Sequence, residues 1–134
     1  MTQFSLSLVG FYFVSAKAAF YPTYPRFDIV THFFGGMAAA IFFTVFFERD
    51  LKKTNVFFTA VFIFVSTAMA GVVWEFFEWW MDNFLMPIVP GMRLSQFSLD
   101  DTLGDLVVDL LGGLVVAAAF LATKHFGKKI SKHA

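Results

Sequence analysis

Long apolar stretches, each close to the length of a membrane-spanning helix, constrain this chain more than any other feature. The hydrocarbon core of a bilayer is about 30 Å thick, and crossing it takes roughly 20 mainly apolar helical residues. Four such windows lie at residues 4–20, 27–47, 55–80 and 101–123. The sequence therefore predicts an all-α protein, a polytopic membrane four-helix bundle. Residues 1–134 form a single transmembrane domain in this prediction, and residues 124–134 form its basic cytoplasmic tail.

The composition excludes a water-soluble fold. Only 15% of the residues are charged and 58% are hydrophobic, whereas about a quarter of the residues in a typical soluble domain are charged. A lipid-facing exterior accommodates this excess of apolar surface, so the lipid bilayer is the first predicted partner. The chain has no Cys, so any metal site must use oxygen and nitrogen ligands. No basic stripe indicates nucleic-acid binding.

The distribution of Lys and Arg predicts the orientation, because positively charged loops are retained in the cytoplasm. Four spans place both termini and the middle loop on one side. That side carries seven basic residues and the opposite side three. The seven are Arg49, Lys52, Lys53, Lys124, Lys128, Lys129 and Lys132; the three are Lys17, Arg26 and Arg93. We therefore expect a multi-pass protein of the inner (cytoplasmic) membrane with both termini cytoplasmic. The first window lacks a basic leading region and a cleavage site, which favours a retained span.

Acidic residues recur at helical spacing in three of the four predicted spans. Residues separated by three, four, seven or eight positions share one face of a helix. The sets are Asp28 with His32, Glu75 with Glu78 and Asp82, and Asp101 with Asp105 and Asp109. In the predicted topology the start of the second span, the end of the third and the start of the fourth meet at the outer side. With Asp100, which precedes Asp101, eight of the ten acids therefore gather there.

Some of these carboxylates are predicted to lie at membrane depth. Asp109 is eight residues beyond Asp101, or about 12 Å along the helix, and Glu75 lies below the Trp79-Trp80 pair. A carboxylate at this depth costs several kcal/mol unless it is paired, protonated or hydrated. The three basic residues on this side are too few to neutralise eight acids. Either several acids are protonated, or bound cations neutralise them.

Cation binding fits the available ligands. Carboxylates with one imidazole suit Mg²⁺, Mn²⁺, Ca²⁺, Fe²⁺ or Zn²⁺. The predicted ligands of a divalent metal ion of open identity are Asp28, His32, Glu75, Glu78, Asp105 and Asp109. The Glu75-Phe-Phe-Glu78 spacing matches that of two-metal helical bundles, but the His of the di-iron pattern is missing, so an oxidase is not predicted.

Simpler interpretations apply to several of these residues. Asp28, Asp100 and Asp101 stand at predicted helix starts, where a carboxylate can cap free N–H groups. Asp82 fits a solvated loop acid equally well. His32 could be an ordinary polar residue at a helix interface. The basic tail can anchor to anionic lipid.

Small residues predict close helix packing, either within the bundle or between copies of the chain. They occur as Gly35-Gly36 before Ala38, Ala70-Gly71, and Gly112-Gly113 before Ala117. A homo-oligomer or a larger membrane complex is therefore an expected assembly.

Three motifs in order carry a resemblance to a known family. They are Asp28-x-x-x-His32-Phe33-x-Gly35, Trp74-Glu75-x-x-Glu78-Trp79 and Asp101-Thr102-x-x-Asp105-x-x-x-Asp109-x-x-Gly112. Over residues 27–113 the chain resembles the YjdF-type inner-membrane proteins, a bacterial group similar in style to the VanZ-like proteins. The chain is shorter than is usual for that group and lacks its additional N-terminal spans. The resemblance implies that the motif residues form one site, in a family whose biochemistry is not established.

Three functions remain open on these observations. The leading one is a membrane protein that binds a divalent cation in an outer-leaflet carboxylate and His site, for cation handling or transport. The second is a metal-dependent membrane enzyme acting on a lipid-borne phosphate, with no catalytic residue assigned. The third is a small structural membrane subunit whose polar network sets helix register. Bound metal in the purified protein would separate the first two from the third.

Overall fold

The computed structural model describes residues 27–89 and 95–130, and these residues are helical apart from short connections. The elements in chain order are α2 (Phe27–Phe46), α3 (Glu48–Lys53), α4 (Val56–Trp80), the π-helix η1 (Met81–Leu85) and α5 (Leu99–Ile130). The described residues contain no strand. The prediction of an all-α helical membrane bundle is confirmed.

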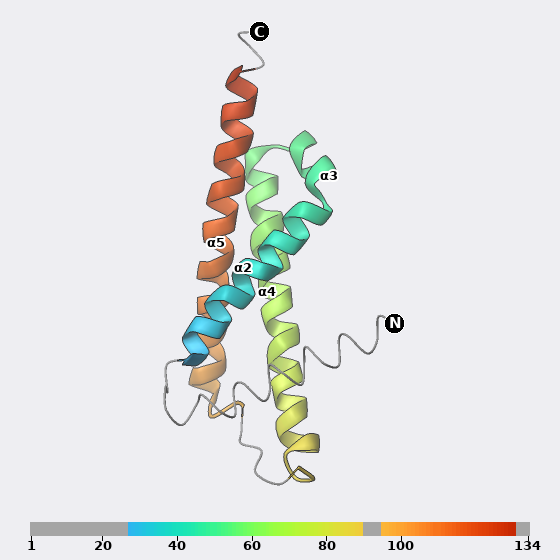
Figure 1. Ribbon diagram of the computed structural model, residues 1–134, viewed down its shortest axis with the longest axis vertical. Helices are drawn as coiled ribbons and strands as arrows, with labels where there is room; N and C mark the ends of the chain where they lie inside the picture. Colours follow the sequence, from blue (N-terminus) through green and yellow to red (C-terminus); the bar gives the residue numbers. More distant parts are fainter. Residues whose placement is uncertain (1–26, 90–94, 131–134) are drawn as a thin grey trace.

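Three long helices form the described bundle (Figure 1). Helices α4 and α5 run in opposite directions, and α2 crosses them obliquely. The start of α2, the end of α4 and the start of α5 all lie toward the lower end of the view, whereas α3 lies near the upper end. This arrangement is the one that the predicted topology required.

These helices are long and apolar enough to cross a membrane, over Phe27–Phe46, Val56–Leu85 and Leu99–Lys124. The first two begin within one residue of the predicted starts, and the third begins two residues early. The predicted span at residues 4–20 lies outside the described residues.

The connection between α4 and α5 is shorter than the predicted spans, residues 55–80 and 101–123, imply. Helix α4 continues without a break into η1, which ends at Leu85, two residues before Pro87. Proline has no backbone N–H and cannot donate the next helical hydrogen bond, which accounts for the stop. Met81, at the junction, is 2% exposed, so packing holds the added turn.

Side-chain caps define the starts of α4 and α5. Asn55 Oδ1 accepts a hydrogen bond from the Phe58 N–H at 2.7 Å. Ser98 Oγ accepts from the Asp101 N–H at 3.2 Å, and Asp101 Oδ2 accepts from the Phe97 N–H at 3.2 Å. Ser98 is therefore the capping residue of α5, whereas Asp101 lies in the first turn and its carboxylate binds an N–H that precedes the helix.

Glycines allow the helix backbones to touch. A Cβ atom on Gly36 would collide with the Asp109 carbonyl, and one on Gly112 with the Phe33 carbonyl. A Cβ on Gly71 would come within 2.6 Å of Asp109 Oδ2. These contacts lie inside one chain, so the small residues act here in packing the bundle.

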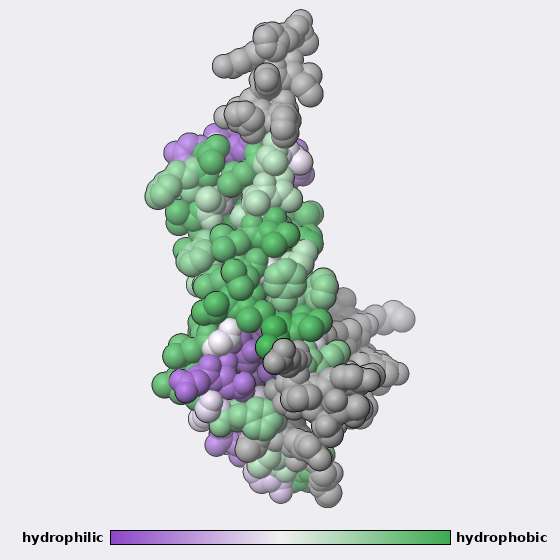
Figure 2. Space-filling model, turned by 90° about the vertical axis from the view of Figure 1, so that its left-hand side faces the viewer, coloured by the Kyte–Doolittle hydropathy of each residue, from purple (hydrophilic) through white to green (hydrophobic). Residues whose placement is uncertain are grey.

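The polarity of the bundle is the reverse of that of a soluble domain. Among the described residues ten buried side chains are polar or charged and five are hydrophobic, whereas large apolar residues such as Phe57 and Phe76 are exposed. Hydrophobic residues cover the middle of the face shown in Figure 2, and hydrophilic residues gather toward its two ends. This distribution suits a protein whose surroundings are lipid.

Candidate functional site

Six buried ionisable side chains from three helices meet near the end of the bundle where α2 and α5 begin. They are between 0% and 6% exposed. We call them the carboxylate–histidine cluster: Asp28 and His32 on α2, Glu75 and Glu78 on α4, and Asp105 and Asp109 on α5. All six residues predicted as metal ligands are thus placed together in the interior.

The imidazole of His32 lies between carboxylates of two helices. Its Nδ1 is 3.5 Å from each carboxylate oxygen of Asp109. Its Nε2 is 3.6 Å from Asp105 Oδ2 and 3.8 Å from Asp28 Oδ1. A protonated imidazole carries one positive charge, so it can offset only one of these three neighbouring carboxylates. Asp105 and Asp109 together carry more negative charge than this imidazole can offset, and the excess needs another partner or a proton.

The two glutamates of α4 complete the cluster from a third direction. Glu78 Oε1 accepts a hydrogen bond from the indole N–H of Trp74 at 3.0 Å. Glu75 Oε2 accepts from Gln96 Nε2 at 2.7 Å. Glu75 Oε1 is buried and has no hydrogen-bond partner among the described residues. A buried oxygen without a partner is costly, and a ligand would remove that cost.

Two sets of potential ligand atoms overlap at His32. Asp28, His32 and Asp105 form one set, and His32, Glu75 and Glu78 form the other. Within each set the ligand atoms lie within 4.8 Å of one another. Ligands on opposite sides of one cation are about 4 to 5 Å apart, since metal–ligand bonds are 2.0 to 2.6 Å long. Each set is therefore close enough to surround one cation.

A second group of contacts ties the chain before α5 to α4 and η1. The carboxylate of Asp82 accepts hydrogen bonds from the Ser95 N–H at 2.8 and 2.9 Å and from the Gln96 N–H at 2.8 Å. Gln96 Nε2 also donates to the Glu75 carbonyl at 3.1 Å. Asp82 is buried, so its interpretation as a solvated loop acid was wrong. Gln96 was missed in the sequence because it lies outside the helices and follows no periodic pattern.

A cavity of about 320 Å³ lies beside the cluster. We call it the lateral cavity. Its buried lining includes His32 and Asp109 of the cluster, and its other lining residues are mainly small. The lining consists of Thr31, His32, Gly35, Gly36, Ala39, Thr67, Ala70, Gly71, Trp74 and Asp109. Only His32 and Asp109 in this set were singled out as ligands from the sequence.

Fold and site together define a helical integral membrane protein with a buried carboxylate and histidine cluster between its spans. Residues 2–125 match the model of the family described as predicted membrane protein (DUF2238), and the chain belongs to that family. No curated protein and no solved structure matches the chain.

Proposed function

We propose that the carboxylate–histidine cluster binds a divalent cation and that cation handling is the function of this membrane protein. One observation carries the proposal. Glu75 Oε1 is buried without a hydrogen-bond partner among the described residues, and His32 Nε2 has only the longer contacts to Asp105 and Asp28, at 3.6 and 3.8 Å. His32 and Glu75 also belong to one set of closely spaced ligand atoms. A cation bound by this set would give the glutamate and the imidazole a common partner.

The charge of the cluster supports the same proposal. Within the described residues, Asp105 and Asp109 have His32 as their only ion-pair partner. Carboxylates at membrane depth are retained where they bind ions or move protons. A divalent cation supplies two positive charges where one imidazole supplies at most one. The hard oxygen ligands with a single nitrogen favour Mg²⁺, Mn²⁺, Fe²⁺, Zn²⁺ or Ca²⁺ as the cofactor.

The surroundings of the cluster bear on two uses of a bound cation: transport through the bundle and chemistry on a lipid-borne phosphate. Ala40, Ile63 and Ala117 form an apolar core, and the Thr67 carbon and oxygen atoms pack against Gly113 beside it. A cation crossing the bundle in this region would meet an apolar barrier, so cation transport would require these helices to separate. The lateral cavity favours a second candidate function, metal-dependent chemistry on a lipid-borne phosphate.

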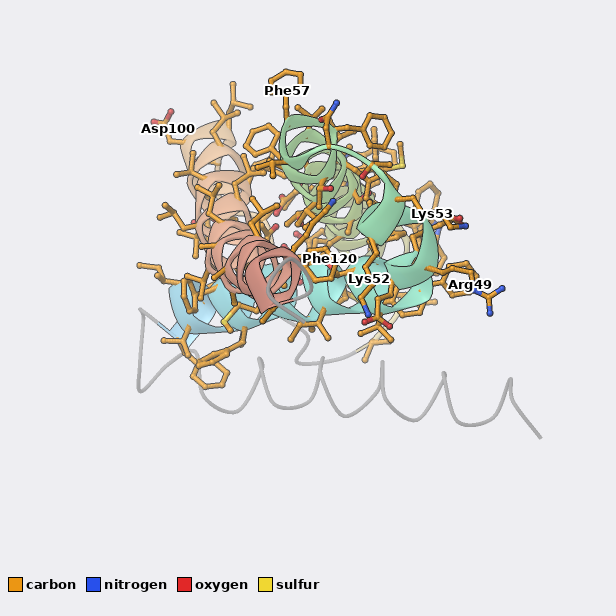
Figure 3. The ribbon with its side chains drawn as sticks, turned by 90° about the horizontal axis from the view of Figure 1, so that it is seen from above. Arg49, Lys52, Lys53, Phe57, Asp100 and Phe120 are labelled. Carbon is orange, nitrogen blue, oxygen red and sulfur yellow. The ribbon has the colours of Figure 1, made fainter. Side chains whose placement is uncertain are left out.

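The membrane and the orientation are part of the proposal. We place the protein in the inner membrane as a YjdF-type protein with both termini cytoplasmic. Arg49, Lys52 and Lys53 project outward from α3 in Figure 3, and α3 lies at the end of the bundle away from the carboxylate–histidine cluster (Figure 1). The positive-inside rule favours the cytoplasm for this end. Self-association, as a homo-oligomer or within a larger complex, is compatible with the short chain. Green fluorescent protein fused to the C-terminus should fluoresce, because it folds in the cytoplasm. If instead only a fusion to alkaline phosphatase, which is active outside the cytoplasm, shows activity, the predicted orientation is reversed.

The metal content of detergent-purified protein tests the central proposal. After incubation with Mn²⁺ and desalting, we expect about one metal ion per chain by inductively coupled plasma mass spectrometry. Asp105→Asn and Glu75→Gln each remove a buried charge from the cluster and should lower the occupancy. Asp100→Asn removes an exposed charge outside the cluster and should not.

Helical circular dichroism and gel filtration should be the same for all four proteins. If native protein holds no metal while both cluster variants fold normally, the cation proposal is wrong. That result would favour the structural subunit, in which the acids are protonated or paired with arginine from a partner.

A further inference from the structure

We propose that the lateral cavity holds the hydrocarbon chain of a phosphate-headed lipid, whose phosphate binds the cation of the carboxylate–histidine cluster. The inference rests on the proposed cation site and deepens it by naming a ligand class. It depends on the position of the cavity in the spans, on the gradient of polarity along it, and on the chemistry of phosphate.

The cavity lies near the middle of two membrane spans. Gly36 is close to the midpoint of the span Phe27–Phe46, and Gly71 is close to the midpoint of Val56–Leu85. Its volume of about 320 Å³ is at the lower end of the range for small-molecule sites. An apolar ligand at this depth can enter from the bilayer without crossing water.

The lining residues make a buried floor and a more accessible rim. His32, Gly36 and Asp109 are buried, whereas Gly35 is exposed and Ala39 is partly exposed. Ala70 and Trp74 of α4 are partly exposed as well, so the described part of the cavity opens between α2 and α4. Because the exposed surface at this depth is apolar, the opening faces lipid chains.

Polarity changes along the length of the cavity. His32 and Ala39 are seven residues apart, or about 10 Å along α2, and Trp74 and Thr67 are the same distance apart on α4. The acids outside the lining, Asp28 and Glu78 among them, are on the side of His32 and Trp74. One end of the cavity therefore adjoins carboxylates and the other adjoins small side chains. A lipid whose head group points outward matches this polarity.

Phosphate is the head group that a cation in this cluster would select. Carboxylates alone repel phosphate, but Mg²⁺ and Mn²⁺ commonly bind one or two carboxylates together with phosphate oxygens. His32 and Asp109 belong both to the cluster and to the cavity lining, so the two binding regions are continuous. A lipid with a neutral head group would gain only the apolar contacts.

Photo-crosslinking with two matched probes tests the inference on the full chain in phosphatidylcholine nanodiscs. The first probe is phosphatidic acid with a diazirine near the middle of one acyl chain. The second is the diacylglycerol with the same chain. With Mn²⁺ present, we expect phosphatidic-acid adducts on peptides that carry Gly35 to Ala39 and Ala70 to Trp74. The diacylglycerol and the EDTA-treated sample should give several-fold fewer adducts there.

A pair of neighbouring substitutions provides the control. Ala39→Leu adds three carbon atoms at the rim of the cavity, whereas Ala38→Leu adds the same atoms at an exposed position outside the lining. Filling the cavity should reduce its labelling roughly tenfold, and the Ala38 variant should label as the native protein does. Ala70→Leu fills the opposite wall and replaces Ala39→Leu if that variant misfolds.

Equal labelling of the Ala38 and Ala39 variants would overturn the inference, as would adducts spread evenly over the exposed apolar residues. The absence of adducts on the cavity peptides would also overturn the inference, including the case in which another part of the chain fills the cavity. If the protein retains Mn²⁺ in these cases, the proposed cation site survives. Cavity labelling that is insensitive to EDTA, in protein without metal, would overturn both proposals.

Discussion

His32 on α2 and Asp109 on α5 meet through Nδ1 and Oδ2 at 3.5 Å, although they are 77 residues apart in the chain. Their contact depends on the glycines around it. Gly36 lies against the Asp109 carbonyl, and Gly71 lies against the Asp109 carboxylate. The backbones of α2 and α5 are close enough for a short aspartate side chain to reach an imidazole on the facing helix.

This dependence predicts that alanine substitution at two adjacent glycines changes the stability of the bundle differently. Gly36→Ala puts a Cβ into the Asp109 carbonyl and should destabilise the bundle by about 1 to 3 kcal/mol. Gly35→Ala places a Cβ 3.9 Å from Asp109 Oδ1, an ordinary contact, and should be neutral or stabilise by up to about 1 kcal/mol. Thermal unfolding in detergent, monitored by gel filtration, measures the change in stability of both variants. Equal losses at the two positions would contradict the close approach of α2 and α5.

Much of the fold and of the cluster could be predicted from the sequence, because both depend on simple spacing. Apolar windows locate the spans, and the four-residue spacing of Asp28 and His32 places them on one helix face. Antiparallel connection then brings the acid-bearing ends together. The structure agrees on each point for the described helices.

The parts that could not be predicted depend on contacts between elements. Gln96 reaches Glu75, and Asp82 reaches the Ser95 N–H, only because η1 extends α4 and brings these segments together. Lys124 was counted with the basic tail but turns toward the α3–α4 connection. No periodicity in the sequence records such contacts, which follow from helix packing.

His32 is shared by both sets of ligand atoms, so replacing it should weaken cation binding more than replacing any single carboxylate. His32→Gln removes the imidazole from both sets, whereas Asp28→Asn alters only one. We expect His32→Gln to reduce Mn²⁺ affinity by at least about 100-fold, since loss of even an outer-shell partner costs 10- to 100-fold. Titration followed by electron paramagnetic resonance of free Mn²⁺ provides the measurement. If Asp28→Asn has the larger effect, His32 is not the shared ligand.

Gln96 is a positioning residue for Glu75. Its amide holds Oε2 at 2.7 Å and leaves Oε1 available to a ligand. Gln96→Leu should lower Mn²⁺ affinity roughly 10- to 100-fold, the range found when the partner of a metal ligand is removed. Asn83→Leu is the matched control, because the Asn83 amide is exposed and, within the described part of the chain, donates only to the Trp79 carbonyl, at 2.8 Å. Similar affinities for both variants and the native protein would show that Glu75 needs no support from Gln96.

At the other end of the bundle, the side chain of Lys124 on α5 binds the segment that joins α3 to α4. Its Nζ donates to the Leu51 carbonyl at 2.5 Å, the Thr54 carbonyl at 2.8 Å and Thr59 Oγ1 at 2.9 Å. The ammonium thus lies at the C-terminal end of α3, where the helix dipole favours a positive charge. This position predicts a structural role in place of lipid anchoring.

Lys124→Met keeps most of the side-chain length but removes all three donors and the charge. Hydrogen bonds from a charged group contribute about 1.5 to 3 kcal/mol, so the free energy of unfolding should fall by at least that amount. Lys53→Met is the control: Lys53 is exposed and, among the described residues, pairs only with Asp50, at 3.4 Å. Such surface pairs contribute at most about 1 kcal/mol. Mn²⁺ binding should be unchanged in both variants, because the cluster lies at the opposite end of the spans. If Lys124→Met instead leaves stability intact and weakens binding to anionic vesicles, Lys124 belongs functionally to the lipid-binding tail.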